Sequence, residues 1–201
     1  MTPPRRRVTA NAVKHELLVF VEGDETEEQY LTHYRRLHRR DVRVEIDPYR
    51  GAPAQLVQRA AAAKKKNERL AKRRGRAHDE VWCVFDVDQH PNLAGAIDQA
   101  RANDVSLAIS SPCLELWFLL HFQAQTGHIN GGEVQALVQE RLQCGKRLDA
   151  DALKLLEENF NVAKERATQL EAKHKGDGTQ FPGNPSSGVW RLIDSIKRTS
   201  Q

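Results

Sequence analysis

Four short apolar runs, each separated from the next by a helical segment, constrain the fold of this chain more than any other feature. The runs cover residues 16–21, 42–47, 81–85 and 106–109. Residues 26–39 have apolar positions spaced by three and four, 54–74 are rich in alanine, lysine and arginine, and 92–103 follow a candidate cap, Asn92. Strands that alternate with helices predict an α/β fold with a parallel four-stranded sheet covered on both faces.

The remainder of the chain is expected to be helical. Ser111 and Pro112 have the residue types of a helix start, and the apolar segment 114–122 that follows is typical of a buried helix. Further helices are predicted at 132–143, 151–159, 162–175 and 189–197, with a loop at 176–188. We therefore expect a loose basic tail at 1–13, an α/β core at 14–123 and a helical extension at 124–201 packed on that core.

The composition favours an ordinary reduced intracellular protein. Hydrophobic residues make up 39% and charged residues 29% of the 201 residues. No apolar run approaches the ~20 residues that a membrane span needs, and no signal peptide is evident. Cys83, Cys113 and Cys144 form no CxxC pair and no zinc-ligand spacing. These features predict a cytoplasmic location with no membrane partner, and they leave the oligomeric state open, a homo-oligomer included.

Acidic residues follow two of the predicted strands at the point where each strand ends. Glu22 and Gly23 come after the first run, and Asp86 and Asp88 come after the third. The carboxyl ends of parallel strands share one edge of a sheet, so these three acids are expected to converge there. Carboxylates that crowd together favour a hard divalent cation such as Mg²⁺ or Mn²⁺. The alternative is that each acid only begins a turn.

Three further residues near these acids have two explanations each. Glu27 either belongs to the acidic site or is favoured by the dipole at a helix start. Glu115 is the only charged residue between positions 111 and 120. It is either a ligand for a second ion or a capped acid in a first helical turn. His90 either transfers protons or binds metal, or it is an ordinary loop histidine.

Positive charge is concentrated in the second predicted helix. The net charge is only +4, but Lys64, Lys65, Lys66, Arg69, Lys72, Arg73 and Arg74 are opposed in that segment by Glu68 alone. Such a block attracts phosphates, although a solvated helix face has the same composition. We select Lys64, Lys65, Lys72 and Arg73 as candidate nucleic-acid contacts, together with the loop residues Arg50 and Lys146.

The acid pattern resembles that of the TOPRIM domain, which has a glutamate after its first strand and a DxD motif after its third. More narrowly, VEGDETEEQY, VWCVFDVDQH, SPCLELWFLLHF and NPSSGVWRLI resemble the RloB family, a TOPRIM-like group associated with bacterial restriction and abortive-infection loci. The resemblance implies catalytic roles for Glu22, Asp86 and Asp88. It implies metal binding by the same three acids, with Glu115 as a candidate ligand for a second ion.

The resulting functional hypothesis is a Mg²⁺- or Mn²⁺-dependent nuclease of an antiphage system that hydrolyses phosphodiesters of DNA or RNA. The alternative is a non-catalytic nucleic-acid-binding or effector-sensing subunit of a defence complex. Residues 144–146 (CGK) lack the flanking residues of a P-loop, so any ATPase activity is expected on a separate partner subunit. A primase and a topoisomerase are less favoured, because the chain has no zinc-ribbon spacing and no separate domain that presents a tyrosine.

Overall fold

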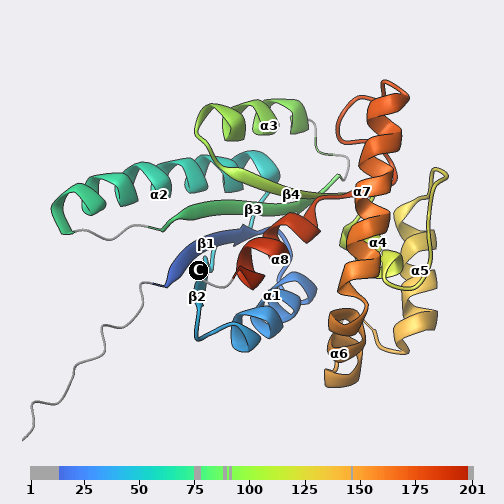
Figure 1. Ribbon diagram of the computed structural model, residues 1–201. Helices are drawn as coiled ribbons and strands as arrows, with labels where there is room; N and C mark the ends of the chain where they lie inside the picture. Colours follow the sequence, from blue (N-terminus) through green and yellow to red (C-terminus); the bar gives the residue numbers. More distant parts are fainter. Residues whose placement is uncertain (1–13, 75–77, 88–89, 91, 146, 199–201) are drawn as a thin grey trace, which may run out of the picture.

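Five strands form one mixed sheet at the centre of the protein (Figure 1). The computed structural model describes residues 14–74, 78–87, 90, 92–145 and 147–198, with the side chains of 73 and 74 left out. The strands lie in the order β2 (Val42–Ile46), β1 (His15–Val21), β3 (Glu80–Asp86), β4 (Ser106–Ser111) and β5 (Ser186–Ser187). The first four are parallel, as predicted, and β5 is antiparallel to β4.

The fifth strand corrects the expected four-stranded sheet. Ser110 and Ser111 of β4 pair with Ser187 and Ser186, and the hydroxyls of Ser110 and Ser187 lie 2.9 Å apart. We had expected residues 176–188 to form only a loop. Two serines are too short a strand to leave a period in the sequence, which is why the pattern did not predict it.

Helices cover both faces of the sheet because its central strands are apolar on both sides (Figure 1). Alternate residues of β1 belong to different hydrophobic clusters: Leu17, Val19 and Val21 to one, Leu18 and Phe20 to the other. The Leu18 cluster packs under α2 (Pro53–Arg74) and α3 (Leu93–Ala102). The Leu17 cluster packs against α1 (Thr26–Leu37), α4 (Leu114–Leu120) and α8 (Val189–Lys197).

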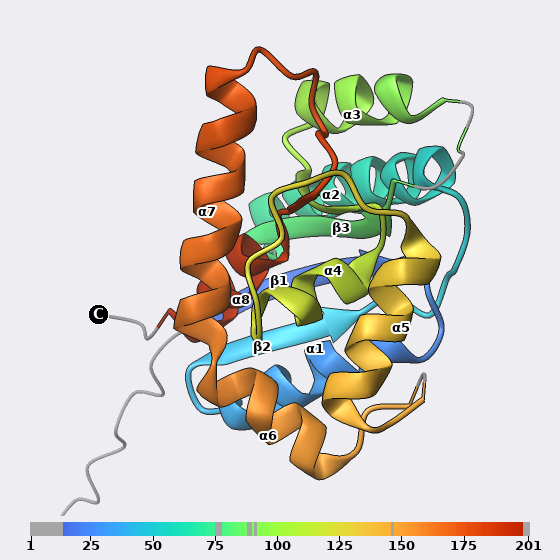
Figure 2. The ribbon, with the colours of Figure 1, turned by 90° about the vertical axis from the view of Figure 1, so that its right-hand side faces the viewer.

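The remaining helices lie beyond α4 and complete the larger cluster. They are α5 (Gly131–Leu142), α6 (Ala150–Glu158) and α7 (Phe160–Gly176), and Figure 2 shows them in front of the sheet. Residues after 123 also supply β5 to the sheet and α8 to its face. The expected core and extension therefore share one hydrophobic interior. Within the described ranges, every helix is too short or too polar to span a bilayer.

The predicted start of the helix after Ser111 is wrong. Ser111 is the last residue of β4 rather than a cap, and α4 begins only at Leu114, after Cys113. The pairing of Ser111 with Ser186 holds it in the sheet. Thr26 is the first residue of α1 and Glu25 is its N-cap. The Gln29 side chain accepts a hydrogen bond from the Leu148 N–H at 2.9 Å.

Candidate functional site

Glu22 and Asp86 lie side by side at the carboxyl edge of the sheet. The Glu22 N–H donates to the Val84 carbonyl at 3.1 Å, which continues the β1–β3 ladder by one residue. The Asp86 N–H in turn donates to Glu22 Oε2 at 3.2 Å. The two acids are thus brought together from adjacent strands. Asp88, the second aspartate of the DxD pattern, lies outside the described residues.

A cavity of about 320 Å³ opens beside this pair, and we call it the acidic cavity. Its walls come from the turn after β1, the end of β3 and the helices α4 and α5. The lining residues are Gly23, Asp24, Glu25, Thr26, Glu27, Asp86, Leu114, Glu115 and Gln135. Five of them are carboxylates and none is a lysine, arginine or histidine, so the wall is strongly negative.

Crowding of carboxylates changes the acidity of Asp86. Burial, followed by the nearby charges of Glu27, Glu115 and Glu22, raises the pKa of Asp86 from 3.8 to about 8. The backbone N–H of Leu114, at the start of α4, bonds the carboxylate and opposes part of this increase. A carboxyl group with this pKa is mostly protonated at neutral pH, which is typical of an acidic site that lacks a balancing cation.

Glu27 is a member of this cluster, and the sequence alone left its role open. Burial raises the pKa of Glu27, and the charges of Glu115 and Glu22 act in the same direction. Its carboxylate folds back over Gly23, so closely that a Cβ at position 23 would lie 2.2 Å from Glu27 Oε2. Gly23 is therefore required for this approach. A glycine between a strand and a helix start was the one sequence signal for it.

Glu115 lies where the sequence placed it, in the first turn of α4. It lines the acidic cavity, and its charge acts on both Asp86 and Glu27. Four carboxylates, from the residue after β1 and from α1, β3 and α4, thus act electrostatically on one another. They are Glu22, Glu27, Asp86 and Glu115.

His90 approaches the same group from the loop after β3. Its Nε2 lies 2.9 Å from Glu22 Oε1, and both side chains are one-quarter exposed. Glu22 therefore contacts His90 through one oxygen and the Asp86 N–H through the other. This double contact fixes the orientation of the Glu22 carboxylate.

Arg50 lies at the outer rim of the acidic cavity and is bound to the protein's own acids. Its guanidinium lies 3.3 Å from Asp24 Oδ1 and 2.7 Å from Glu28 Oε2, and it also donates to the Asp47 carbonyl. The side chain is only 19% exposed. Arg50, a candidate phosphate contact, is thus a partly buried cation at the rim that forms ion pairs with two carboxylates.

The other candidate contacts with nucleic acid lie away from the acids. Lys65 and Lys72 are exposed on the second half of α2, whereas Lys64 turns toward α3 and binds the carbonyl and carboxylate of Asp104. The side chain of Arg73 and the whole of Lys146 lie outside what the structure describes. Of the candidate contacts on α2, Lys65 and Lys72 are therefore the two that the structure describes as exposed.

The acidic cavity has the donor set that Mg²⁺ or Mn²⁺ prefers, because it offers carboxylate oxygens from several elements. Within the described ranges, no three His, Cys, Asp or Glu side chains are already arranged around one ion position. Coordination by these residues would require rotation of their side chains. The like charges around Asp86 give a physical reason for a cation to bind there.

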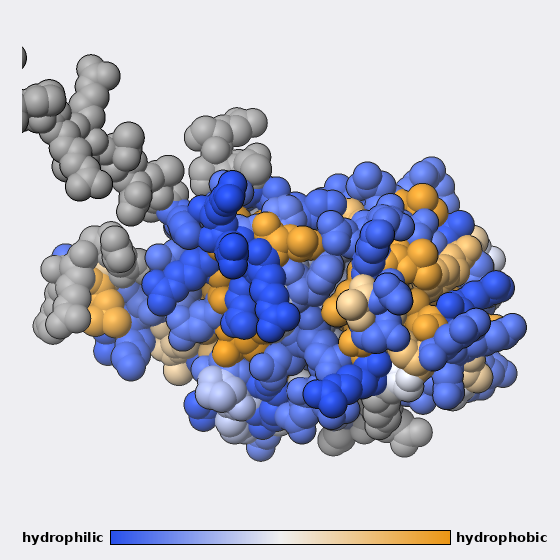
Figure 3. All heavy atoms as spheres, turned by 90° about the horizontal axis from the view of Figure 1, so that it is seen from below, coloured by the Kyte–Doolittle hydropathy of each residue, from blue (hydrophilic) through white to orange (hydrophobic). Residues whose placement is uncertain are grey.

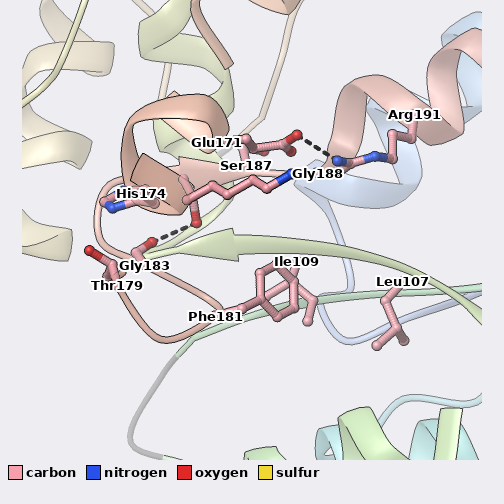
Figure 4. Close-up of a pocket in the computed structure, with 12 residues that line it drawn as sticks. Leu107, Ile109, Glu171, His174, Thr179, Phe181, Gly183, Ser187, Gly188 and Arg191 are labelled. Atoms are coloured by element: carbon pink, nitrogen blue, oxygen red, sulfur yellow. Dashed lines mark hydrogen bonds and ion pairs between the residues drawn. The ribbon is translucent and has the colours of Figure 1, made fainter. Parts of the chain in front are cut away.

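A second cavity of about 330 Å³ lies beside β4 and β5, and we call it the edge cavity (Figure 4). Its floor includes Leu107 and Ile109, and Phe181 lies at its mouth with 60% of its surface exposed. One ion pair lies at its wall, since Arg191 lies 2.5 Å from Glu171 and stacks over Trp190. Lys175 also lines the cavity and makes no ion pair in the described residues. Glu171 is the one carboxylate that lines the edge cavity in the described residues, so it lacks the crowded negative charge of the acidic cavity.

Comparison with known proteins gives one match. The family of RloB-like proteins matches residues 17–196. This range contains every described helix and strand, apart from the first two residues of β1 and the last residue of α8. No curated protein and no solved structure matches the chain. The matched range includes the whole acidic cavity and the edge cavity. On this extent of agreement, the chain belongs to the RloB-like family.

Proposed function

We propose that this protein is a divalent-metal-dependent nuclease with a TOPRIM-type core, acting on DNA or RNA in a bacterial antiphage system. The observation that carries the proposal is the group of four carboxylates that act on one another, Glu22, Glu27, Asp86 and Glu115. The last three line a cavity without a lysine or arginine among its lining residues. Such a group is costly to a fold unless it binds a cation or shares protons. The parallel order of β1, β3 and β4 supports the TOPRIM assignment.

The acids fit a metal by the chemistry of their oxygen donors. Glu22, Asp86 and Glu115 would hold it, with Asp88 as an expected fourth ligand and Glu27 close enough to replace a water ligand. When bound, Mg²⁺ or Mn²⁺ would lower the pKa of an attacking water and stabilise charge on the phosphate. The protein's own contribution is orientation, since Glu22 is held by the Asp86 N–H and by His90.

Asp86 and Glu22 differ in their surroundings, and this indicates different roles for them in the reaction. Asp86 is partly buried, and burial is the main cause of its raised pKa, so it suits ligation more than proton transfer to solvent. Glu22 is one-quarter exposed and contacts His90, so this pair could pass a proton from the attacking water to solvent. The exposed cations of α2 would supply affinity for the phosphate backbone.

Cleavage of labelled DNA and RNA, with Mg²⁺, with Mn²⁺ and with a chelator, tests the proposal. We expect metal-dependent cleavage that is lost in Glu22→Gln, because that substitution keeps the shape and removes the charge. Glu140→Gln is the matched control, since Glu140 is an exposed glutamate on α5 that does not line the cavity. Equal cleavage by wild type and Glu22→Gln would exclude the acidic cavity as the catalytic centre.

Binding without turnover would favour a different class of function. If nucleic acid binds equally well to wild type and Glu22→Gln and is never cleaved under any metal condition, the protein is a nucleic-acid-binding subunit. Cleavage would then be sought after mixing with the ATPase subunit that we expect to act with it.

A further inference from the structure

The exposed face of α2 carries cations that have no carboxylate partners. Lys65, Lys66, Arg69 and Lys72 are all exposed, and none of them pairs with an acid in the described part of the chain. Lys64, one position away, differs because it is largely buried against Asp104. Unpaired surface cations are the groups that neutralise phosphates and release counterions when nucleic acid binds.

These cations follow one side of the helix. Lys65, Arg69 and Lys72 are spaced by four and three residues, which places them on one stripe of an α-helix. Lys66 is seven residues after Arg59, so these two flank the same stripe. The Arg59 guanidinium lies 4.1 Å from the centroid of the Tyr49 ring, which holds it near the start of the helix.

The stripe leads away from the acidic cavity. The loop before α2 contacts the cavity wall, because Arg50 lies 3.3 Å from Asp24. The helix then begins at Pro53 and runs back along the sheet, antiparallel to the strands (Figure 1). At a rise of 1.5 Å per residue, Lys65 lies about 18 Å and Lys72 about 28 Å beyond Pro53 along the helix axis.

We infer that the substrate of the acidic cavity is a polynucleotide at least about 8 base pairs long, whose backbone lies along this stripe. The inference rests on the proposed function and adds a length requirement to it. Lys72 lies about 28 Å along the helix from Pro53, where α2 begins after the loop that contacts the cavity wall, and this span equals about 8 steps of 3.4 Å. Mononucleotides and dinucleotides reach the acids without touching the cations.

The binding of labelled DNA and RNA duplexes of increasing length, from about 4 to about 24 base pairs, tests this. The protein is used as Glu22→Gln with a chelator present, so that nothing is cleaved. We expect affinity to rise steeply near 8 base pairs and then to level off. Replacement of Lys65, Lys66, Arg69 and Lys72 by Gln should remove the rise. It should also weaken binding of the longest duplex by at least about tenfold and reduce the salt slope by about 3 to 4.

A matched control exists on the other face of the sheet. Arg35, Arg36, Arg39 and Arg40, at the end of α1, are also four exposed cations without acidic partners in the described ranges. Figure 3 views this face from below and shows it to be mainly hydrophilic. Their replacement by Gln removes the same charge but leaves α2 intact, so the length dependence should persist.

The outcomes separate the inference from the proposed function. Equal loss of binding in the α1 and α2 variants would overturn the inference, because the effect would then be one of net charge. Affinity that does not change with length would also overturn it. Metal-dependent cleavage of a small phosphodiester with no length effect would leave the nuclease proposal standing. Length-dependent binding along α2 with no cleavage would support the inference about α2 and exclude the nuclease proposal.

Discussion

The acidic cavity and the edge cavity are close in volume, about 320 and 330 Å³, but opposite in charge balance. In the edge cavity Arg191 pairs with Glu171, and Ser186 donates to the Gly183 carbonyl. In the acidic cavity, Asp86, Glu27 and Glu115 repel one another. Volume alone therefore does not identify a functional site. Charge that the protein does not neutralise by itself is the more informative property.

Substitutions in the two cavities should differ most in their effect on catalysis. We expect Asp86→Asn to reduce metal-dependent cleavage by at least about 100-fold, because a neutral amide is a poor ligand for Mg²⁺. Glu171→Gln in the edge cavity should change cleavage by less than about twofold. Single-turnover rates on one substrate measure both. Comparable losses in the two variants would show that the edge cavity also takes part.

Metal ions should stabilise the fold through the acidic cavity only. Mg²⁺ or Mn²⁺ at about 100 times its dissociation constant should raise the free energy of unfolding by about 2.7 kcal/mol, since the ion binds the folded state. Thermal melts with and without metal measure the increase. Asp86→Asn should lose it and Glu171→Gln should retain it. An equal increase in both variants would place the ion elsewhere.

Without metal, Asp86 should make the fold less stable as pH rises. In the unfolded chain this carboxyl ionises near 3.8, whereas in the fold its pKa is about 8. Between these values the folded state holds more protons, so stability falls with pH and levels off above the folded pKa. Asp86→Asn should flatten this decline and should be more stable than wild type above pH ~8 by at least about 1 kcal/mol. Melts over a pH series with a chelator test the sign, and a stability that rises through this range would contradict it.

The smallest expected effect belongs to the edge cavity. Glu171→Gln should destabilise the protein by about 0.5 kcal/mol, because the pair with Arg191 is partly exposed and solvent screens it. Denaturant unfolding at fixed pH measures the loss. A gain in stability, as predicted for Asp86→Asn, would erase the contrast between the two cavities.

The sequence predicted the elements that have a strong period or strong composition. The four parallel strands and all eight helices were expected near their observed positions, since apolar runs and helical spacing persist over many residues. The two-residue β5 and the start of α4 were not predicted, because both depend on pairing between segments that are far apart in the sequence.

The same distinction holds for the candidate site. The neighbouring positions of Glu22 and Asp86 follow from parallel strands that end at one edge, so a sequence pattern could predict them. Glu27 was ambiguous, since an acid near a helix start has a local explanation that needs no site. The pairing of Lys64 with Asp104 could not be foreseen either, because it depends on how α2 and α3 pack.

The short β5 has a consequence for how the chain can be shortened. It covers one end of β4 through Ser110 and Ser111, and the Gly188 N–H donates to the Ile109 carbonyl at 2.8 Å. Removal of residues 186–201 would uncover this strand and the apolar face beneath α8. An uncovered edge strand is a template for pairing with another chain. A truncated form without this segment should therefore aggregate or form strand-paired dimers, and binding studies require the intact C-terminus.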